Sequence, residues 1–400
     1  MIFRPRSLRH LVGVIVSVVA VAAASIAGCA GRSIVAPPES GVQSRSSSSG
    51  TYQLVYSFQG GSDGIEPGAP LVSLSGTLYG TTRGGGANGV GTVYSVTPAG
   101  AENVIHSFGA SGDGESPGSG LAILAGTLYG TASLDAVNAC GVVYSITPAG
   151  VETPLHTFSG SPDGCRPESP VAPVGGTLFG MTQSGGKPLQ FGVLYKVTTA
   201  GVEHVVHAFG GTPSDGAYPT SSLLNVSGTI YGTTDAGGTS GMGTVFTRAQ
   251  GGAVSVIYSF KGGTDGANPL GGLVNLNGTF YGTTSRGGAS GYGTVYSITP
   301  AGAHNVVYSF TGTNGDGVNP IGNLAVQNGV LFGVTSAGGA SLDGIAYSMT
   351  AGGVETIVHT FTGGSADGDN PQAGLIVARG KIYGTTAFGG AQGMGTVFHL

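Results

Sequence analysis

The chain ends on GMGTVFHL (residues 393–400), which is the beginning of a pattern that occurs in full earlier as GYGTVYSITPAGAHNVVYSF (291–310). In the earlier copy a further strand-like segment closing on Ser-Phe follows, whereas at the C-terminus the chain stops before it. That segment stands at the other end of the repeats, as YQLVYSF at 52–58, with no partner strands before it. The two ends therefore complete one structural unit, and the sequence predicts a closed ring.

A unit of 50 to 52 residues recurs seven times from residue 51 onward. The aromatic residue of an LYG-like motif recurs at Tyr79, Tyr129, Phe179, Tyr231, Tyr281, Phe332 and Tyr383. The phenylalanine that closes the YSF-like motif recurs at Phe58, Phe108, Phe158, Phe209, Phe260, Phe310 and Phe361. A DGxxP motif begins at Asp63, Asp113, Asp163, Asp215, Asp265, Asp316 and Asp367. Such a register indicates an array of internal repeats.

Each unit has the pattern of four short strands. In the fifth unit these are GGLVNLN, TFYGTTS, GTVYSIT and NVVYSF, rich in β-branched and aromatic residues and bounded by Gly, Pro, Asn and Ser. A strand repeat of this length predicts an all-β, seven-bladed propeller with four-stranded blades, in which the N-terminal strand 52–58 completes the C-terminal blade. The alternative is a linear solenoid, which would require polar capping repeats; neither end resembles one.

The unit F-x-G-G-x-x-D-G-x-x-P…G-x-L-Y-G-T-T-x-x-G-G…G-T-V-[FY] resembles the GloVer tandem repeat of bacterial "choice-of-anchor" surface proteins. The resemblance covers residues 52–400 and implies export and anchoring, but no activity. Three units depart from the pattern by losing the Gly-Gly or the spacing after it: TASLDAVNACG at 131–141, KPLQFG at 187–192 and SLDG at 341–344.

The first 29 residues are expected to be a targeting segment. Arginines precede an apolar run from Leu11 to Ala24 that is short for a membrane span. The following Ile26-Ala27-Gly28-Cys29 resembles the lipobox of bacterial lipoproteins, which implies cleavage before Cys29 and lipid attachment to its thiol. Ala30, rather than an aspartate, favours outer-membrane sorting by the rule of that family. The alternative is an ordinary secretory signal with a chance cysteine.

The domain organisation follows from these segments. Residues 1–29 are the signal peptide and residues 30–50, rich in Ser, Pro and Gly, form a flexible tether. Residues 51–400 form the propeller. We therefore expect an exported protein, lipid-anchored in the outer membrane or at the cell surface of a bacterium, with the membrane as a partner through its anchor.

Composition limits the possible partners. Charged residues make up 8% of the chain and the net charge is -5, so there is no basic patch for nucleic acid. We expect no nucleic-acid partner, a monomer, and an unidentified glycan or protein ligand. The absence of Trp argues mildly against a strong sugar-stacking platform.

A ligand or catalytic site on such a ring is usually asymmetric, so residues present in every blade are interpreted as structural. The seven DGxxP aspartates are expected to bond backbone amides in their own turns; one aspartate per blade does not supply the oxygens that Ca²⁺ requires. A slot that holds either His or Tyr is interpreted as a half-buried packing position: Tyr56, His106, His156, His207, Tyr258, Tyr308 and His359. We predict no catalytic residue, no metal site and no cofactor.

The variable residues gather on one face. In a four-stranded antiparallel blade, the second-to-third loop and the blade-to-blade connection emerge at the same end, and both are long here. Loops on a rigid scaffold are common binding sites. The ligand-binding candidates on this face are Arg83, Arg166, Phe191, Tyr218, Asp235, Arg286, Tyr292 and Phe388. Further blade-specific charges there are Glu66, Glu168, Lys187 and Asp343. Alternatively, all are ordinary solvated loop residues.

Three functions remain open. The first, which we expect rather than an enzyme, is a binding or scaffolding module that contacts a glycan or protein through the long-loop face. The second is an enzyme acting on a polysaccharide at the central channel of that face, for which Glu66, Glu115 and Glu168 are weak candidates without an evident partner. The third is a purely structural surface protein.

Two cysteines remain once Cys29 is acylated. Cys140 ends the second-to-third loop of the second blade, and Cys165 lies in the connection that leaves that blade. Both loops emerge on the long-loop face of a protein exported to a compartment where disulfides persist. We predict a disulfide between Cys140 and Cys165; the alternative is two unrelated small core residues.

Overall fold

The structure, a computed structural model, describes residues 52–400 except residues 111 and 136–138. The predicted signal peptide, lipid-attachment site and tether lie outside the described residues. Within the described part, no helix is long and apolar enough to cross a membrane.

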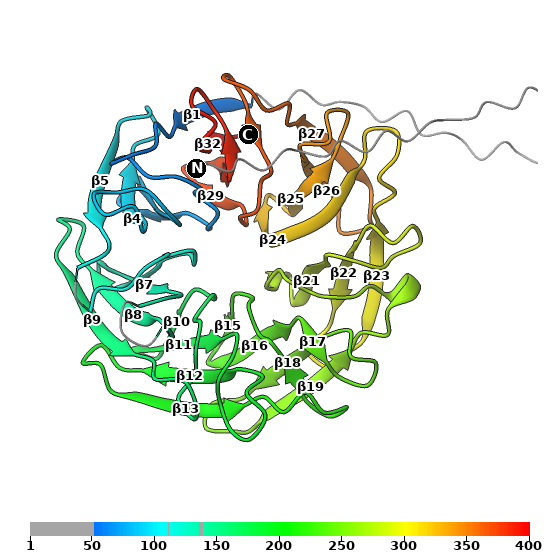
Figure 1. The fold of residues 1–400 in the computed structure, drawn as a ribbon. Helices are drawn as coiled ribbons and strands as arrows, with labels where there is room; N and C mark the ends of the chain where they lie inside the picture. Colours follow the sequence, from blue (N-terminus) through cyan, green and yellow to red (C-terminus); the bar gives the residue numbers. More distant parts are fainter. Residues whose placement is uncertain (1–51, 111, 136–138) are drawn as a thin grey trace, which may run out of the picture. The chain divides into compact units, whose positions relative to one another are not determined.

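Seven four-stranded antiparallel sheets stand around a ring (Figure 1), which confirms the predicted propeller. Blade I contains β2 (Val72–Leu74), β3 (Thr77–Thr82), β4 (Thr92–Val96) and β5 (Glu102–Ser107). Blade II contains β6 (Ala122–Leu124), β7 (Thr127–Ala132), β8 (Val142–Ile146) and β9 (Glu152–Thr157). Blade III contains β10 (Ala172–Val174), β11 (Thr177–Thr182), β12 (Val193–Val197) and β13 (Glu203–Ala208).

The remaining blades follow the same order. Blade IV contains β15 (Leu224–Val226), β16 (Thr229–Thr234), β18 (Thr244–Arg248) and β19 (Val254–Ser259). Blade V contains β20 (Val274–Leu276), β21 (Thr279–Thr284), β22 (Thr294–Ile298) and β23 (His304–Ser309). Blade VI contains β24 (Gly317–Gln327), β25 (Val330–Gly338), β26 (Ile345–Met349) and β27 (Glu355–Thr360). A single 3₁₀ turn, η1 (Gly263–Asp265), is described between blades IV and V.

Blade VII is built from both ends of the repeat array. It contains β29 (Ile376–Ala378), β30 (Lys381–Thr386), β32 (Thr396–His399) and β1 (Gln53–Ser57). Strand β1 pairs antiparallel with β32, from Gln53 opposite His399 to Ser57 opposite Thr396. The closure predicted from the truncated last unit is therefore confirmed. It leaves β32 with a partner on each side, so this strand is not an open edge that could pair with another chain.

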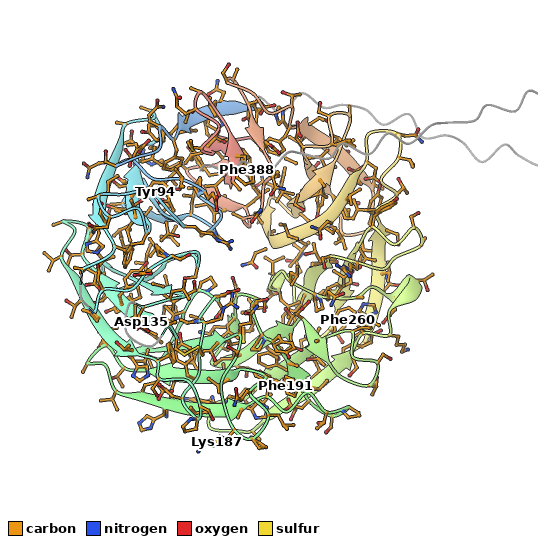
Figure 2. All side chains as sticks on the ribbon, in the orientation of Figure 1. Tyr94, Asp135, Lys187, Phe191, Phe260 and Phe388 are labelled. Atoms are coloured by element: carbon orange, nitrogen blue, oxygen red, sulfur yellow. A yellow bond between two sulfur atoms is a disulfide. The ribbon has the colours of Figure 1, made fainter. Side chains whose placement is uncertain are left out.

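An aromatic pair joins each blade to the next. The phenylalanine that ends the fourth strand of one blade meets the aromatic ring of the third strand in the following blade, with centroids 4.9 to 5.4 Å apart and steeply inclined planes. Phe58–Tyr94 closes the ring in this way between blades VII and I. Figure 2 labels two members, Tyr94 and Phe260. Each edge-to-face pair contributes about 1 kcal/mol beyond the burial of its area.

The glycine of the LYG-like motif follows from the same packing. Tyr94 is fully buried, and its ring lies across Gly80 on the neighbouring strand. A Cβ at Gly80 would stand 2.5 Å from the Tyr94 hydroxyl oxygen, a separation that real side chains do not tolerate. The motif therefore repeats because the buried ring of each third strand needs a neighbour without a side chain.

The two long connections of each blade are tied together. Short pairs form between β14 (Gly216–Ala217) and β17 (Ala236–Gly237), and between β28 (Gly368–Asp369) and β31 (Phe388–Gly389). In blade VI the long β24 and β25 pair across the same region. Isolated bridges do the same in the other blades: Ile65 with Gly84, Glu115 with Leu134, Cys165 with Ser184 and Ala267 with Arg286. These loops are therefore held in place by backbone hydrogen bonds, which the sequence did not indicate.

The first strands are shorter than predicted in every blade except VI, where β24 is longer. GGLVNLN was expected to form a strand over 271–277, but β20 covers only Val274–Leu276. The preceding glycines lie close to the neighbouring blades: a Cβ on Gly271 would overlap the carbonyl oxygen of Gly322. The inner ends of the blades thus converge on the axis and form the wall of the central channel.

Candidate functional site

A hydrogen bond between a fourth strand and the following DGxxP aspartate recurs in all seven gaps between blades. The donor is a Tyr hydroxyl or a His Nε2, and the distances to the carboxylate are 2.6 to 3.2 Å. The same carboxylate accepts a backbone N–H just after the closing phenylalanine in each gap, at 2.5 to 3.1 Å. We call this arrangement the interblade clamp; its aspartate confirms the expected turn-bonding role.

The clamp revises the interpretation of the His/Tyr slot. The slot was interpreted as a packing position, and its rings do pack edge-to-face on the closing phenylalanine, as His106 does on Phe108. However, what its two residue types share is an N–H or O–H that reaches the same carboxylate. Burial opposes ionisation of Asp215, yet the hydrogen bonds from His207 and Gly210 outweigh burial and lower its pKa.

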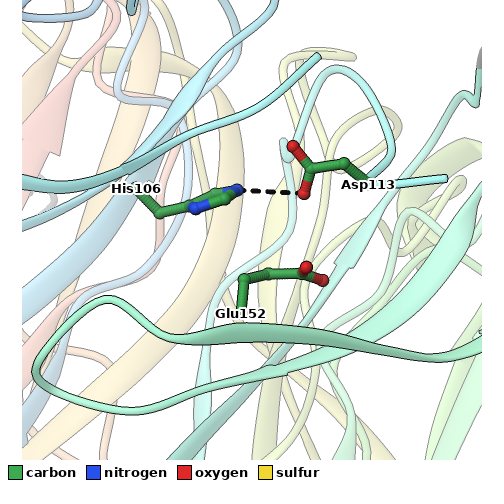
Figure 3. A group of neighbouring side chains, drawn as sticks. All are labelled: His106, Asp113 and Glu152. Carbon is green, nitrogen blue, oxygen red and sulfur yellow. Dashed lines mark hydrogen bonds and ion pairs between the residues drawn. The ribbon is translucent and has the colours of Figure 1, made fainter. Parts of the chain in front are cut away.

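A third group enters the clamp from the next blade. Glu152, the first residue of β9, lies beside the bonded pair His106 and Asp113 (Figure 3). Burial, and then the neighbouring Asp113 carboxylate, raise the pKa of Glu152 to about 7. Burial and a neighbouring aspartate likewise raise the pKa of Glu102, beside Asp63, and of Glu203, beside Asp163, to about 7. A fourth gap holds Glu355 at this position, and the remaining three hold Val254, His304 and Tyr52.

Two of these groups have the composition of a metal site. The ligand atoms of His106, Asp113 and Glu152 lie within 4.8 Å of one another, as do those of His156, Asp163 and Glu203. One imidazole nitrogen and two carboxylates could hold a divalent ion such as Zn²⁺. The other gaps favour hydrogen bonding as the role, because tyrosine takes the histidine's place in three of them and donates to the same aspartate.

The mouth of the central channel is the asymmetric region of the molecule. A cavity of about 290 Å³ lies where the entries to the first strands of all seven blades converge. A second cavity of about 330 Å³ adjoins it between blades I and III. Both are lined by Arg83, Gly118, Ser119 and Glu168, and Arg166 joins the second. Two of the three arginines predicted as ligand contacts, Arg83 and Arg166, are thus brought to one place, although they are 83 positions apart in the sequence.

Arg83 is accommodated at the mouth by a glycine. Its side chain lies against Gly118, where an added Cβ would stand 2.8 Å from the arginine Nε. Gly118 has no positive φ, so its backbone conformation does not require a glycine. A glycine is needed there because any side chain would collide with Arg83. The Arg83 side chain forms no ion pair and no hydrogen bond with any residue that the structure describes. Its guanidinium is therefore an exposed cation without a carboxylate partner among the described residues, and the missing side chain of Gly118 leaves room for it.

Arg166 and Glu168 form an ion pair beside it. Arg166 Nη2 lies 2.8 Å from Glu168 Oε1, and the arginine side chain is 52% exposed. The backbone of Arg166 has φ 60, in the left-handed region. The same position has positive φ in every blade and is asparagine in three: Asn268, Asn319 and Asn370. Asparagine adopts this conformation at lower cost than other residues do, and Glu66, Ser116 and Tyr218 occupy the position in the remaining blades, so the backbone does not require an arginine there.

The other predicted contacts are distributed over several blades. Phe191 and Tyr218 form an edge-to-face pair with centroids 5.3 Å apart. Tyr292 and Phe388 are 43% and 41% exposed, in blades V and VII. Asp235 and Arg286 lie in the loops of blades IV and V. Lys187 stands at the outer edge of the ring, away from the centre (Figure 2). The structure therefore gathers only Arg83, Arg166 and Glu168 of the named residues around one cavity.

Cys140 and Cys165 are joined by a disulfide, with their Cα atoms 4.3 Å apart, as the sequence analysis expects. The same slot is filled by other side chains in other blades, such as Tyr292 with Val318, which both approach Gly312. Neighbouring backbone also matches, since Arg166 N–H donates to the Cys140 carbonyl as Asn319 N–H donates to that of Tyr292. The disulfide therefore replaces a non-covalent contact between the two long connections.

A family model described as the Gloeobacter/Verrucomicrobia repeat matches residues 37–246 and 124–328. No curated protein matches the chain. Among solved structures, a puromycin-hydrolyzing peptidase from Mycobacterium tuberculosis is similar, with a TM-score of 0.50, 9% identity, and coverage of 83% of this chain and 52% of that one. A gluconolactonase from Xanthomonas campestris has a TM-score of 0.42, 12% identity, and coverage of 68% and 81%. This chain spans about half the length of the peptidase, and the similarity extends to the fold alone.

Proposed function

This chain belongs to the Gloeobacter/Verrucomicrobia repeat family, and we propose that it is a binding or scaffolding module, lipid-anchored through Cys29 on the exported side of a bacterial membrane. Its ligand engages the channel mouth on the long-loop face. The ligand carries negative charge, as an acidic glycan or an acidic protein segment does, and an acidic glycan is the first class to test.

The uncompensated Arg83 carries this proposal. A guanidinium presents donors in a planar fork that matches a carboxylate. Arg166 lies on the wall of the same cavity, while Glu168 already engages it. The chain as a whole has net charge -5, so general electrostatic attraction does not account for an anion preference, and a local site is required.

The test is binding of the full chain to immobilised polygalacturonate, with dextran as the uncharged comparison. Arg83→Ser copies the serine that blades II, V and VI hold at this position, Ser133, Ser285 and Ser336, so the fold is expected to tolerate it. We expect this variant to bind at least about tenfold more weakly, since a charged hydrogen bond contributes about 1.5–3 kcal/mol.

A matched control is Arg286→Ala, which removes another exposed loop arginine and copies Ala236 and Ala337. Its binding should equal that of the wild type. The proposal is wrong if polygalacturonate is not retained, or if Arg83→Ser binds as well as the wild type. Appearance of shortened oligosaccharides during the incubation would instead favour a polysaccharide-active enzyme.

Anchoring is tested separately. Cys29→Ser should remove lipid attachment and shift the protein from the membrane fraction to the soluble fraction, with an unchanged melting temperature. Retention of this variant in the membrane fraction would contradict the lipid anchor without affecting the binding proposal.

A further inference from the structure

An arginine replaces a core residue in blade IV. Arg248 ends β18 and lies opposite Ile230 on β16. The corresponding last residue of the third strand in five other blades is apolar and at most 1% exposed: Val96, Ile146, Val197, Ile298 and Met349. A residue that every blade holds is explained by the fold, but a residue found in one blade is not. Arg248 is such a residue, because it places a charge at a strand position that is apolar and buried in five other blades.

Among the residues that the structure describes, none accepts a hydrogen bond from the guanidinium of Arg248. Its Nε is buried and has no hydrogen-bond partner, and the group lies over the ring of Phe179 in blade III, 5.5 Å from the centroid. It forms no ion pair with any residue that the structure describes. A cation–π contact offsets part of the cost of removing a guanidinium from water, but an isoleucine here would have no such cost.

A second cation lies next to the same aromatic ring. Lys196 on β12 is the cross-strand neighbour of Phe179. Five other blades hold a small hydroxyl residue at this position, Ser95, Ser145, Thr247, Ser297 and Ser348, and blade VII holds His399. Lys196 also has no side-chain partner among the described residues. Two departures from the repeat, in adjacent blades, thus place positive charge on the same ring.

These side chains line a cavity of about 490 Å³ between blades III and IV. Asn225 and Gln250 add amide groups to its wall, and no carboxylate lines it. The cavity is formed by the tight turns at Val174 to Thr177 and at Gln250 to Gly251, so it lies at the opposite end of the blades from the long connections.

We propose that this cavity is a second binding site, distinct from the channel mouth, for an oxyanion group of a small ligand. A carboxylate, sulfate or phosphate supplies the hydrogen-bond acceptors that Arg248 lacks, and Lys196 adds a point charge. The planar fork of the arginine gives bidentate contact, which a lysine alone does not provide. The site goes beyond the proposed function, since it uses other residues on the other face.

The experiment is isothermal titration of the full chain with sodium glucuronate, sodium sulfate and sodium phosphate in separate arms at constant ionic strength. The arm that saturates identifies the class of oxyanion. Arg248→Ile, which copies Ile146 and Ile298, should weaken that binding at least tenfold, and Lys196→Ser should weaken it several-fold. Arg83→Ser should leave it unchanged, so a failure here is separable from a failure at the channel mouth.

A readout without ligand tests whether Arg248 is merely structural. The melting temperature of Arg248→Ile should equal or exceed that of the wild type, because an apolar residue fits this slot in the other blades. A clear fall in the melting temperature would assign Arg248 to stability and overturn the proposal. Failure of all three oxyanions to bind the wild type at millimolar concentration would overturn it as well.

Discussion

The gaps between blades and the mouth of the central channel are built from the same seven repeats, but they follow opposite rules. In the gaps, the same aspartate receives the same two kinds of hydrogen bond seven times, whether the donor is His106 or Tyr56. At the mouth, equivalent positions hold Arg83, Gln183 and Asp235 in different blades. Chemistry that every blade needs is repeated, whereas the residues at the mouth differ from blade to blade, as the proposed binding site requires.

Removing β1 is the most severe test of the repeated part. Deletion of residues 52–58 takes away the fourth strand of blade VII, the Phe58–Tyr94 pair and the clamp between Tyr56 and Asp63. It also exposes β32 as an open edge. We expect loss of most soluble monomer, measured by size-exclusion chromatography. A deletion variant that elutes as a monomer with unchanged melting temperature would contradict closure by the N-terminal strand.

The disulfide shows that a feature present once can still be structural. Its loop spans 25 residues, and in the chain-entropy model such a cross-link stabilises the fold by about 3 kcal/mol. The Cys140→Ser/Cys165→Ser variant should therefore unfold at lower denaturant concentration, while binding at the channel mouth persists. Two titratable thiols per chain in the denatured, unreduced Cys29→Ser protein would mean that the bond is absent.

The clamp is tested by separating its acceptor from its donor. Asp113 is 3% exposed and accepts from His106, Gly109 and Ala110. Asp113→Ala leaves these donors without an acceptor and should lower the free energy of unfolding by about 2 kcal/mol. His106→Tyr copies the donor of three other gaps and should change it by less than about 1 kcal/mol. Equal losses in both variants, measured by chemical denaturation, would show that the clamp depends on histidine itself.

The smallest effect is on the pH dependence of stability. Burial and the neighbouring Asp63 raise the pKa of Glu102 to about 7. The folded state therefore holds this proton more tightly than the unfolded chain, and the contribution of Glu102 to stability is complete below its ordinary pKa and is lost as the pH rises through 7. The side chain is only partly buried, so solvent screening reduces the effect.

We expect the melting temperature to fall by roughly 1–3 °C between about pH 5 and about pH 8 because of this group. Glu102→Gln keeps a neutral donor beside Asp63 at all pH values and should flatten that part of the curve. A parallel curve for the variant, measured by differential scanning calorimetry, would show that Glu102 does not titrate in this range.

Much of the fold was predictable because its signals are local or periodic. The repeat of Phe58 and its six equivalents, the β-branched strands and the truncated last unit fixed the blade number, the strand order and the closure, all of which the structure confirms. The Cys140–Cys165 pairing was within reach for the same reason, since it joins two loops whose common end follows from blade topology.

Some contacts were hidden although each partner was visible in the sequence. The sequence shows the seven aspartates and the seven His/Tyr residues as separate repeated positions, but it does not show their hydrogen bond, because that contact depends on how each connection folds back onto the fourth strand. Arg248 is visible in the sequence as a charged residue at a repeat position that is apolar in other blades. The repeated motifs do not include this position, so they do not draw attention to it.

The sequence by itself determined that this chain is a seven-part ring and which residues differ between the parts, because periodicity specifies each blade and the order of its strands. Only the tertiary structure decided which of the differing residues meet. The place of Arg83 over Gly118, of Glu152 beside Asp113 and of Arg248 over Phe179 depends on how neighbouring blades are inclined and how closely they pack. That geometry is set by the whole ring of aromatic contacts and glycines, so no single repeat contains it.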